Sequence, residues 1–221
     1  MFNELISQLK TQGANFVKIV DISMFPATEN RGYNKAILIG IVLEPSYIFR
    51  LCNENIIDYY QFSEKEKAAD SLAEWTADFI EARGYKAYAQ SEKNLALHGF
   101  YEETTKTTPL PHKKIALLAG IGWIGKSNLL VTQEYGSAIC MCTVLTNATL
   151  PTENKPIIKP KCGDCTVCKD ICPTGVIRGA TWEIAMNRDL IVNVYHCETC
   201  LKCLANCPWT LKYEKGDISA T

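Results

Sequence analysis

Apolar runs and amphipathic stretches alternate through the first part of the chain and predict a mixed succession of strands and helices. Residues 36–43 (AILIGIVL) are apolar at every position, which predicts a central strand covered on both faces. A shorter run at 16–22 predicts another strand. Apolar residues three to four positions apart at 3–12 predict a short helix, whereas the turn-forming residues of 23–34 indicate a loop.

The clearest helical pattern begins at Ser63. Ser63 and Glu66 have the spacing of a capping box, and Gly84 favours the end of the helix. One apolar stripe is formed by Ala69, Leu72, Trp75, Phe79 and Ile80. The opposite face, which we expect to be solvated, holds Lys67, Asp70, Glu74 and Asp78. A strand is expected over 85–89, and the polar residues 91–111 predict a long loop.

The segments after this loop are shorter. Residues 113–119 are compatible with either a helix or a strand. Residues 129–132 and 137–145 are expected to form the two strands of a hairpin around Tyr135 and Gly136. The proline-bearing segment 154–161 indicates a linker, and a helical spacer is expected over 180–196.

The last quarter of the chain holds two copies of one cysteine pattern, C-x2-C-x2-C-x3-C-P, at 162–173 and 197–208. This spacing is typical of two-cluster ferredoxins, in which the fourth cysteine of each run ligates the other [4Fe–4S] cluster. The expected ligands of the first cluster are Cys162, Cys165, Cys168 and Cys207. Those of the second are Cys197, Cys200, Cys203 and Cys172. The proline after each fourth cysteine favours the first turn of a short helix. A zinc site is a weaker interpretation, because zinc sites usually show separated cysteine pairs. A disulfide framework is also weaker, because such frameworks belong to secreted chains.

Length and charge narrow the class of protein. The 221 residues accommodate an α+β cofactor-binding or substrate-binding domain at 1–153 and a small cluster-binding domain at 154–221. A net charge of −1 does not indicate nucleic acid as a partner. Because neither a signal peptide nor an apolar run of eighteen residues is present, we expect a cytoplasmic protein without a membrane partner.

Residues 120–127 (GIGWIGKS) match two phosphate-binding motifs, those of nucleotide hydrolases and of dinucleotide-binding domains. Both motifs require a strand before the glycines and a helix after them, but the following SNLLVT favours a strand. Two interpretations of this segment remain open. Backbone N–H groups and Lys126 can contact an anion, or the glycines can simply permit a tight turn.

Several isolated residues are weaker candidates. Cys140 and Cys142 lie two apart on an expected strand and therefore share a face, either as small buried residues or as a wall of a cofactor pocket. His98 and His112 flank the long loop and are candidate proton donors, and His196 adjoins a cluster ligand.

Three segments together resemble the epoxyqueuosine reductase and reductive dehalogenase family of corrinoid iron–sulfur proteins: 120–136 (GIGWIGKSNLLVTQEYG), 162–175 (CGDCTVCKDICPTG) and 197–209 (CETCLKCLANCPW). The resemblance implies a nitroreductase-like α/β sandwich domain followed by a small two-cluster (8Fe–8S) ferredoxin-like domain. It also implies that electrons pass through the two [4Fe–4S] clusters to a corrinoid such as cobalamin, which drives removal of a halide or an epoxide oxygen. The residues it would place near the corrinoid are Gly122, Trp123, Gly125, Lys126, Ser127 and Asn128.

The proton donor of epoxyqueuosine reductases, an aspartate, would fall at 105–107, where this chain has no aspartate; Glu102 and Glu103 are the nearest acids. The chain also ends before the tRNA-binding repeats of that family. We therefore expect an oxidoreductase acting on a small molecule, with unassigned catalytic residues and an electron donor such as ferredoxin or flavodoxin, and nucleic acid is not expected as a partner. The alternative is an electron-transfer protein without an organic cofactor, and a nucleotide-binding iron–sulfur protein using 120–127 is less favoured.

Overall fold

The computed structural model describes residues 1–54 and 59–217. By its internal contacts the chain separates into two compact units, which are described individually. Unit 1 comprises residues 1–41, 63–120 and 140–156, and unit 2 comprises residues 42–62, 121–139 and 157–221. The expected division at 153/154 stays a prediction, because segments that precede it accompany the cysteine-rich segment in unit 2.

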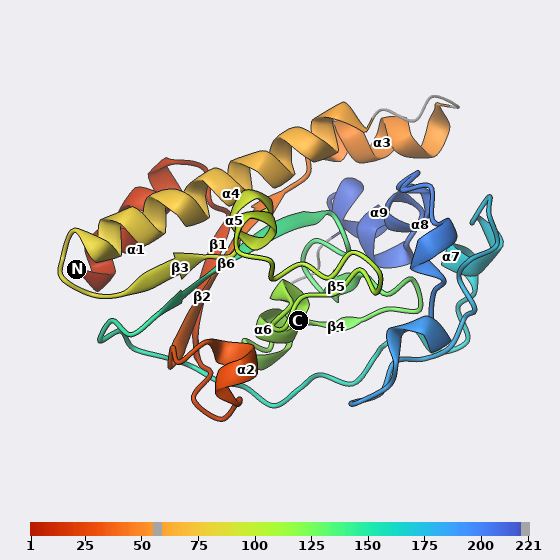
Figure 1. Ribbon diagram of the computed structural model, residues 1–221. Helices are drawn as coiled ribbons and strands as arrows, with labels where there is room; N and C mark the ends of the chain where they lie inside the picture. The colour runs from red at the N-terminus through yellow and green to blue at the C-terminus, as the bar shows by residue number, and fades with distance from the viewer. Residues whose placement is uncertain (55–58, 218–221) are drawn as a thin grey trace. The chain divides into compact units, whose positions relative to one another are not determined.

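The structure is a mixture of helices and strands, as the sequence predicts (Figure 1). The strands are β1 (Phe16–Asp21), β2 (Lys35–Val42), β3 (Ala87–Ala89), β4 (Gly122–Ile124), β5 (Leu130–Thr132) and β6 (Ile139–Thr146). The helices are α1 (Phe2–Thr11), α2 (Ala27–Asn30), α3 (Pro45–Asn53), α4 (Tyr60–Glu81), α5 (Glu92–Leu97), α6 (His112–Leu118), α7 (Val167–Asp170), α8 (Lys202–Ala205) and α9 (Pro208–Glu214), with 3-10 turns η1 (Arg188–Leu190) and η2 (Val194–His196). No helix in the described ranges has the length and apolar character needed to cross a membrane.

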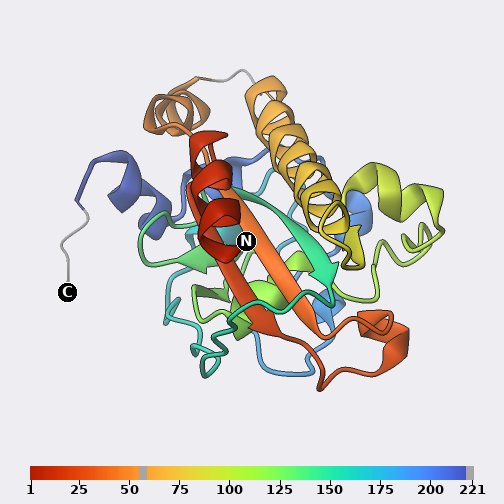
Figure 2. The same ribbon diagram turned by 90° about the vertical axis from the view of Figure 1, so that its left-hand side faces the viewer.

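Unit 1 is built on a four-stranded sheet in the order β1-β2-β6-β3. The apolar run at 36–43 forms an inner strand whose residues 36–42 are all buried, which confirms the expected central strand. β1 pairs antiparallel with β2, and β3 pairs antiparallel with β6. Helices α1 and α4 cover one face, where Leu5 and Ile80 join Ile37 in the core (Figures 1 and 2). Helix α6 lies on the other face, since His112 contacts Thr143, the neighbour of the core residue Cys142.

Helix α4 differs from its prediction in two respects. It begins at Tyr60, so Ser63 is a helical residue inside the first turn and not a cap. Its polar face is also not simply solvated, because Asp70 accepts a hydrogen bond from the Glu92 N–H (2.9 Å) and Glu74 accepts one from the Ser91 hydroxyl (2.8 Å). The polar face of α4 is therefore partly covered by the segment around Ser91 and Glu92. Its end agrees with prediction, since Gly84 follows at a φ of +81°.

Helices occur at several places where none is predicted. The short helix α2 lies inside the expected loop 23–34. α3 follows Pro45 at its first position, which is favourable because the missing N–H has no partner there. α5 lies inside the expected loop 91–111 and is capped by Ser91, whose hydroxyl accepts from the Asn94 N–H. Of residues 113–119, which the sequence left open between helix and strand, 113–118 belong to α6 and Ala119 caps its C-terminus.

The predicted hairpin of 129–132 with 137–145 is wrong. β5 pairs with β4, with Trp123 opposite Val131, whereas β6 joins the sheet of unit 1 between β2 and β3. Local alternation marks a strand but not its partner, so the pairing was misassigned. The turn at Tyr135 and Gly136 is present, and Gly136 exchanges backbone hydrogen bonds with Thr132.

The cysteine-rich segment of unit 2 is mostly irregular. The predicted helix over 180–196 is wrong, because only η1 and η2 form there. Pro208 begins α9 directly after Cys207, as predicted. No helix follows Pro173 after the first run, contrary to the same rule. In this unit α3 packs against α8 and α9.

Candidate metal centre

The segment GIGWIGKSN forms a tight β-hairpin. β4 runs from Gly122 to Ile124, and the Gly125 N–H donates to Leu129 O (2.9 Å) across the turn. A side chain at Gly122 would come within 2.2 Å of Val131 O, so this glycine is required by the close approach of the strands. A strand, and not a helix, follows the motif, as predicted. The context of a nucleotide-binding loop is therefore missing.

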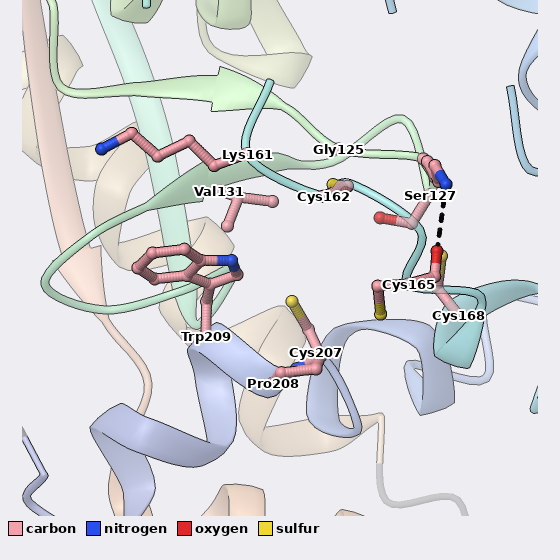
Figure 3. Close-up of a pocket in the computed structure, with 11 residues that line it drawn as sticks. Gly125, Ser127, Val131, Lys161, Cys162, Cys165, Cys168, Cys207, Pro208 and Trp209 are labelled. Carbon is pink, nitrogen blue, oxygen red and sulfur yellow. Dashed lines mark hydrogen bonds between the residues drawn. The ribbon is translucent and has the colours of Figure 1, made fainter. Parts of the chain in front are cut away.

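One face of this hairpin lines a cavity of about 130 Å³ in unit 2 (Figure 3). Three cysteines of the first run and the last cysteine of the second run meet there: Cys162, Cys165, Cys168 and Cys207. The rest of the lining is Gly125, Lys126, Ser127, Val131, Lys161, Pro208 and Trp209. The fold thus brings together the four residues that the ferredoxin rule assigns to one cluster.

The thiols of this pocket influence one another. Burial, together with the smaller effects of the neighbouring thiolates Cys162, Cys207 and Cys165, raises the pKa of Cys168 to about 11. Burial also raises the pKa of Cys207, to which Cys162 and Cys165 contribute. Because burial and the neighbouring thiolates disfavour ionisation of Cys168 and Cys207, these two need a cationic partner to be thiolates.

The remaining cysteines form a second group. Burial raises the pKa of Cys203 to about 12, with contributions from Cys200, Cys197, Cys168 and Cys172. Cys172 behaves differently: burial opposes its ionisation, but hydrogen bonds from Thr174 and from the N–H groups of Val176 and Ile177 lower its pKa on balance. Backbone donors around a cysteine sulfur are typical of iron–sulfur ligands.

The described residues contain no group of three or more His, Cys, Asp or Glu side chains placed to hold a single metal ion. The four cysteines nevertheless line one pocket. The two observations agree if the guest is larger than one ion, because the thiolates of an iron–sulfur cube bind separate iron atoms and do not converge on a point. The donor set, four thiols with no carboxylate, fits iron–sulfur chemistry.

The side chains behind the pocket are aromatic. Trp123 is 1% exposed and meets Trp209 edge to face with ring centroids 5.0 Å apart. Lys161 places its ammonium group 5.7 Å from the Trp123 ring. Of the six residues that the resemblance places near a corrinoid, Trp123 is therefore enclosed by protein, and Gly125, Lys126 and Ser127 face the cysteines.

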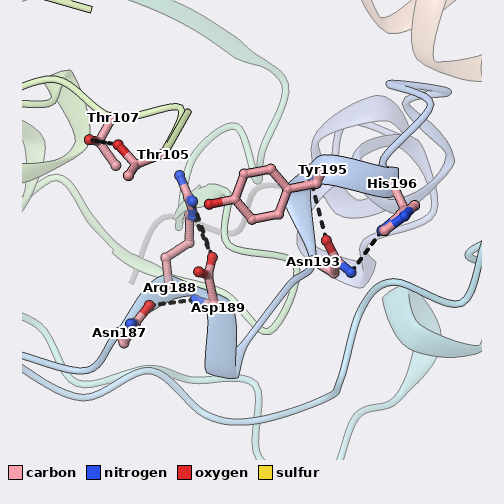
Figure 4. Close-up of polar contacts among 8 residues, drawn as sticks. All are labelled: Thr105, Thr107, Asn187, Arg188, Asp189, Asn193, Tyr195 and His196. Carbon is pink, nitrogen blue, oxygen red and sulfur yellow. Dashed lines mark hydrogen bonds and ion pairs between the residues drawn. The ribbon is translucent and has the colours of Figure 1, made fainter. Parts of the chain in front are cut away.

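A second cavity, of about 400 Å³, lies beside Cys172 and is lined by Thr174, Gly175, Val176, Arg178, Asn193 and His196. Asn193 organises its rim, since its amide lies 2.9 Å from His196 Nδ1 and its carbonyl oxygen accepts from the Tyr195 N–H (Figure 4). The imidazole of His196 thus contacts an asparagine at the edge of the cysteine cluster.

The isolated candidates in unit 1 are structural in their surroundings. Cys140 and Cys142 are buried on β6, and burial raises both pKa values, that of Cys140 to about 12. Cys142 also hydrogen-bonds Asp70, whose pKa is raised by burial. His112 lies 2.9 Å from the Thr143 hydroxyl, and burial lowers its pKa to about 4. Such an imidazole is neutral at pH 7 and is a poor proton donor.

The region where the resemblance places a proton donor is a small turn. Glu102 and Thr107 bridge through their backbones, and the Thr105 and Thr107 hydroxyls lie 2.7 Å apart (Figure 4). Glu102 is exposed, and hydrogen bonds from the Thr104 hydroxyl and N–H lower its pKa. A carboxylate stabilised in this way releases its proton more readily than usual and holds none at neutral pH.

Comparison with known proteins confirms the predicted resemblance. An epoxyqueuosine reductase of Bacillus cereus is 38% identical over 111 residues, which cover 42% of this chain and 29% of that enzyme. The fold is similar to an epoxyqueuosine reductase bound to a tRNA-Tyr stem loop (TM-score 0.61, 17% identity, 95% of this chain and 65% of that one). It is also similar to a reductive dehalogenase whose structure suggests a mechanism for B12-dependent dehalogenation (TM-score 0.64, 18% identity, 94% and 32%). No protein-family model matches the chain.

These matches cover only part of each relative. The chain spans less than a third of the length of the Bacillus cereus relative. The structural neighbours are below 20% identity and share the fold. Because one of them is bound to a tRNA stem loop, the expectation that nucleic acid is not a partner is not supported.

Proposed function

We propose that this chain is an iron–sulfur oxidoreductase whose two [4Fe–4S] clusters carry electrons toward a reductive reaction. The observation that carries the proposal is the meeting of Cys162, Cys165, Cys168 and Cys207 at one pocket. Cys207 lies 39 to 45 positions after the other three cysteines and completes a single all-thiol ligand set with them, which is the ligation pattern of two-cluster ferredoxins. The second set would be Cys197, Cys200, Cys203 and Cys172.

The protein surroundings explain how the clusters would be held and tuned. Pro208 fixes the first turn of α9 beside Cys207, and Trp209 and Val131 cover the pocket with apolar surface. Hydrogen bonds around Cys172 stabilise its thiolate form. Solvent exclusion and hydrogen bonds to sulfur both influence the reduction potential of an iron–sulfur cluster. We also propose that the chain joins a nitroreductase-like domain to a ferredoxin-like domain.

Two double variants test the ligand assignment. With crossed ligation, Cys162→Ala/Cys207→Ala removes ligands from one cluster only and leaves about four iron atoms. Cys162→Ala/Cys172→Ala then damages both clusters. If each run instead ligates its own cluster, Cys162→Ala/Cys207→Ala damages both clusters and Cys162→Ala/Cys172→Ala damages only one. Cys140→Ala is the matched control, because Cys140 is buried outside the runs and its loss should leave about eight iron atoms. A reconstituted wild-type protein with about four iron atoms or fewer contradicts the two-cluster proposal.

A corrinoid is the proposed acceptor of the electrons, on the basis of the B12-dependent relative. When bound, it would supply the reduced cobalt that removes a halide or an epoxide oxygen from a small substrate. The fit to this chain is incomplete, because Lys126 is engaged by the first cysteine run and Trp123 is buried. A ferredoxin or flavodoxin is the proposed donor of the electrons.

An electron-transfer protein without an organic cofactor is the second candidate. It is favoured by the same observation, that Lys126 donates to the first cysteine run and Trp123 packs against Trp209. Titration with cob(II)alamin under anaerobic conditions separates the two. A base-off spectrum that saturates supports the corrinoid enzyme, and no spectral change at saturating corrinoid supports the carrier.

A further inference from the structure

Lys126 reaches from the β4–β5 turn into the first cysteine run. Its ammonium group donates to Gly163 O (2.7 Å) and to Cys165 O (3.1 Å). These two carbonyls flank Asp164 within the loop that carries two expected cluster ligands. The same loop is closed by the Cys165 N–H donating to Cys162 O (3.0 Å). The lysine therefore holds the ligand loop at its middle.

The backbone that carries Lys126 is itself fixed. The Asn128 N–H donates to Gly125 O (2.9 Å), and Asn128 adopts a left-handed φ of 62°. A side chain at Gly125 would lie 2.8 Å from Val131 Cγ2, so the turn is closely packed. A cation held by two carbonyls on a rigid turn is pre-organised, and little rotamer entropy remains to be lost when a cluster binds.

We propose that Lys126 is a positioning residue of the first cluster, which fixes the ligand loop and places a permanent positive charge beside the cluster. This inference rests on the proposed cluster. Four thiolates make the cluster anionic, and reduction by one electron, taken from the external donor, adds one more negative charge. A neighbouring cation stabilises the reduced form more than the oxidised form, which raises the reduction potential. This role differs from the phosphate or corrinoid contact that the motif suggests.

The test compares three variants of the complete, reconstituted protein. Lys126→Met removes the charge and keeps the apolar stem, whereas Lys126→Arg keeps the charge and the donors. Lys161→Met is the matched control, because Lys161 lines the same cavity but lies over the Trp123 ring and, in the described chain, donates no hydrogen bond to the cysteine run. The readouts are the midpoint potential, followed by EPR during a dithionite titration, and the rate of iron loss to a chelator.

In Lys126→Met we expect the equilibrium constant for reduction of one cluster to fall about tenfold, a shift of about 59 mV for one electron. Iron should also be lost several times faster from this variant. Lys126→Arg should restore most of both properties, and Lys161→Met should change them less. A potential in Lys126→Met equal to that of the wild type overturns the inference, even if iron is lost faster. An equal shift in Lys161→Met overturns it as well. Failure of the wild-type protein to hold about eight iron atoms would instead refute the proposed function.

Discussion

Gly136 offers a direct test of how unit 2 holds its second cysteine run. The residue has a φ of +56°, and a methyl group added to it would lie 2.3 Å from Thr210 N and 2.5 Å from Thr210 Cα. Both contacts are with the backbone of α9, three residues after Cys207. Gly136→Ala should therefore push the first turn of α9 away from the 132–136 turn and displace the cysteine that precedes it.

The expected loss of stability has two parts. An alanine in the left-handed region costs about 1–2 kcal/mol. A contact of 2.3 Å with backbone cannot be relieved by a rotamer change, and overpacking of this kind costs about 1–3 kcal/mol. Gly216→Ala isolates the first part, because Gly216 belongs to the same unit, has a φ of +73° and has nothing within 4 Å of an added methyl group.

The assay is anaerobic urea unfolding of the reconstituted proteins, followed by circular dichroism, together with iron analysis. Gly136→Ala should be less stable than Gly216→Ala by about 1–3 kcal/mol and should lose iron from one cluster. Equal unfolding midpoints and equal iron contents in the two variants would refute the argument that α9 is held at this contact.

Three further predictions concern buried polar groups. Because burial lowers the pKa of His112 from 6.5 to about 4, the folded state binds fewer protons than the unfolded state between these values. The contribution of His112 to the free energy of unfolding should be fully present above pH 6.5 and should fall toward pH 4 by at most about 1.4 kcal/mol per pH unit. In unfolding experiments, His112→Gln should flatten this dependence on pH. Thr210→Val deprives the Ser137 N–H of its acceptor at 2.9 Å and should cost about 1–3 kcal/mol in a urea titration. Burial raises the pKa of Asp70. The contribution of Asp70 to stability is therefore largest below its unfolded-state pKa and is lost as the pH rises through its folded-state pKa. Asp70→Asn keeps an acceptor for the Glu92 N–H and should remove this dependence of stability on pH between acidic and neutral pH.

The sequence predicted the elements whose signals are local. The all-apolar run at 36–43 became the buried inner strand, and the stripe through Leu72 and Ile80 became the inward face of α4. Prediction from the sequence failed where contacts with other segments of the chain overrode a local preference. Ser63 has a capping pattern but lies within α4, and the 180–196 segment has no long helix, because the surrounding chain determines which backbone groups are paired there.

Residues 120–127 show the same difference between what local sequence predicts and what tertiary contacts decide. The glycines of 120–127 matched motifs that bind phosphate, yet in the structure they permit the close pairing of β4 and β5. The partner of Lys126 could not be read from its neighbours, because Gly163 and Cys165 lie 37 and 39 residues further along the chain. A lysine beside glycines has the same sequence signal whether it binds an anion or a pair of carbonyls.

The cysteine spacing by itself determined the kind of ligand set, since the thiols of one run lie on a short loop and their number and order are fixed by the sequence. Only the tertiary structure could bring Cys207 to the pocket of Cys162, Cys165 and Cys168, and bring Lys126 to their loop. The physical reason is range. Loop and turn geometry is fixed within a few residues, whereas contacts across 37 to 45 residues depend on how packing closes the chain between them.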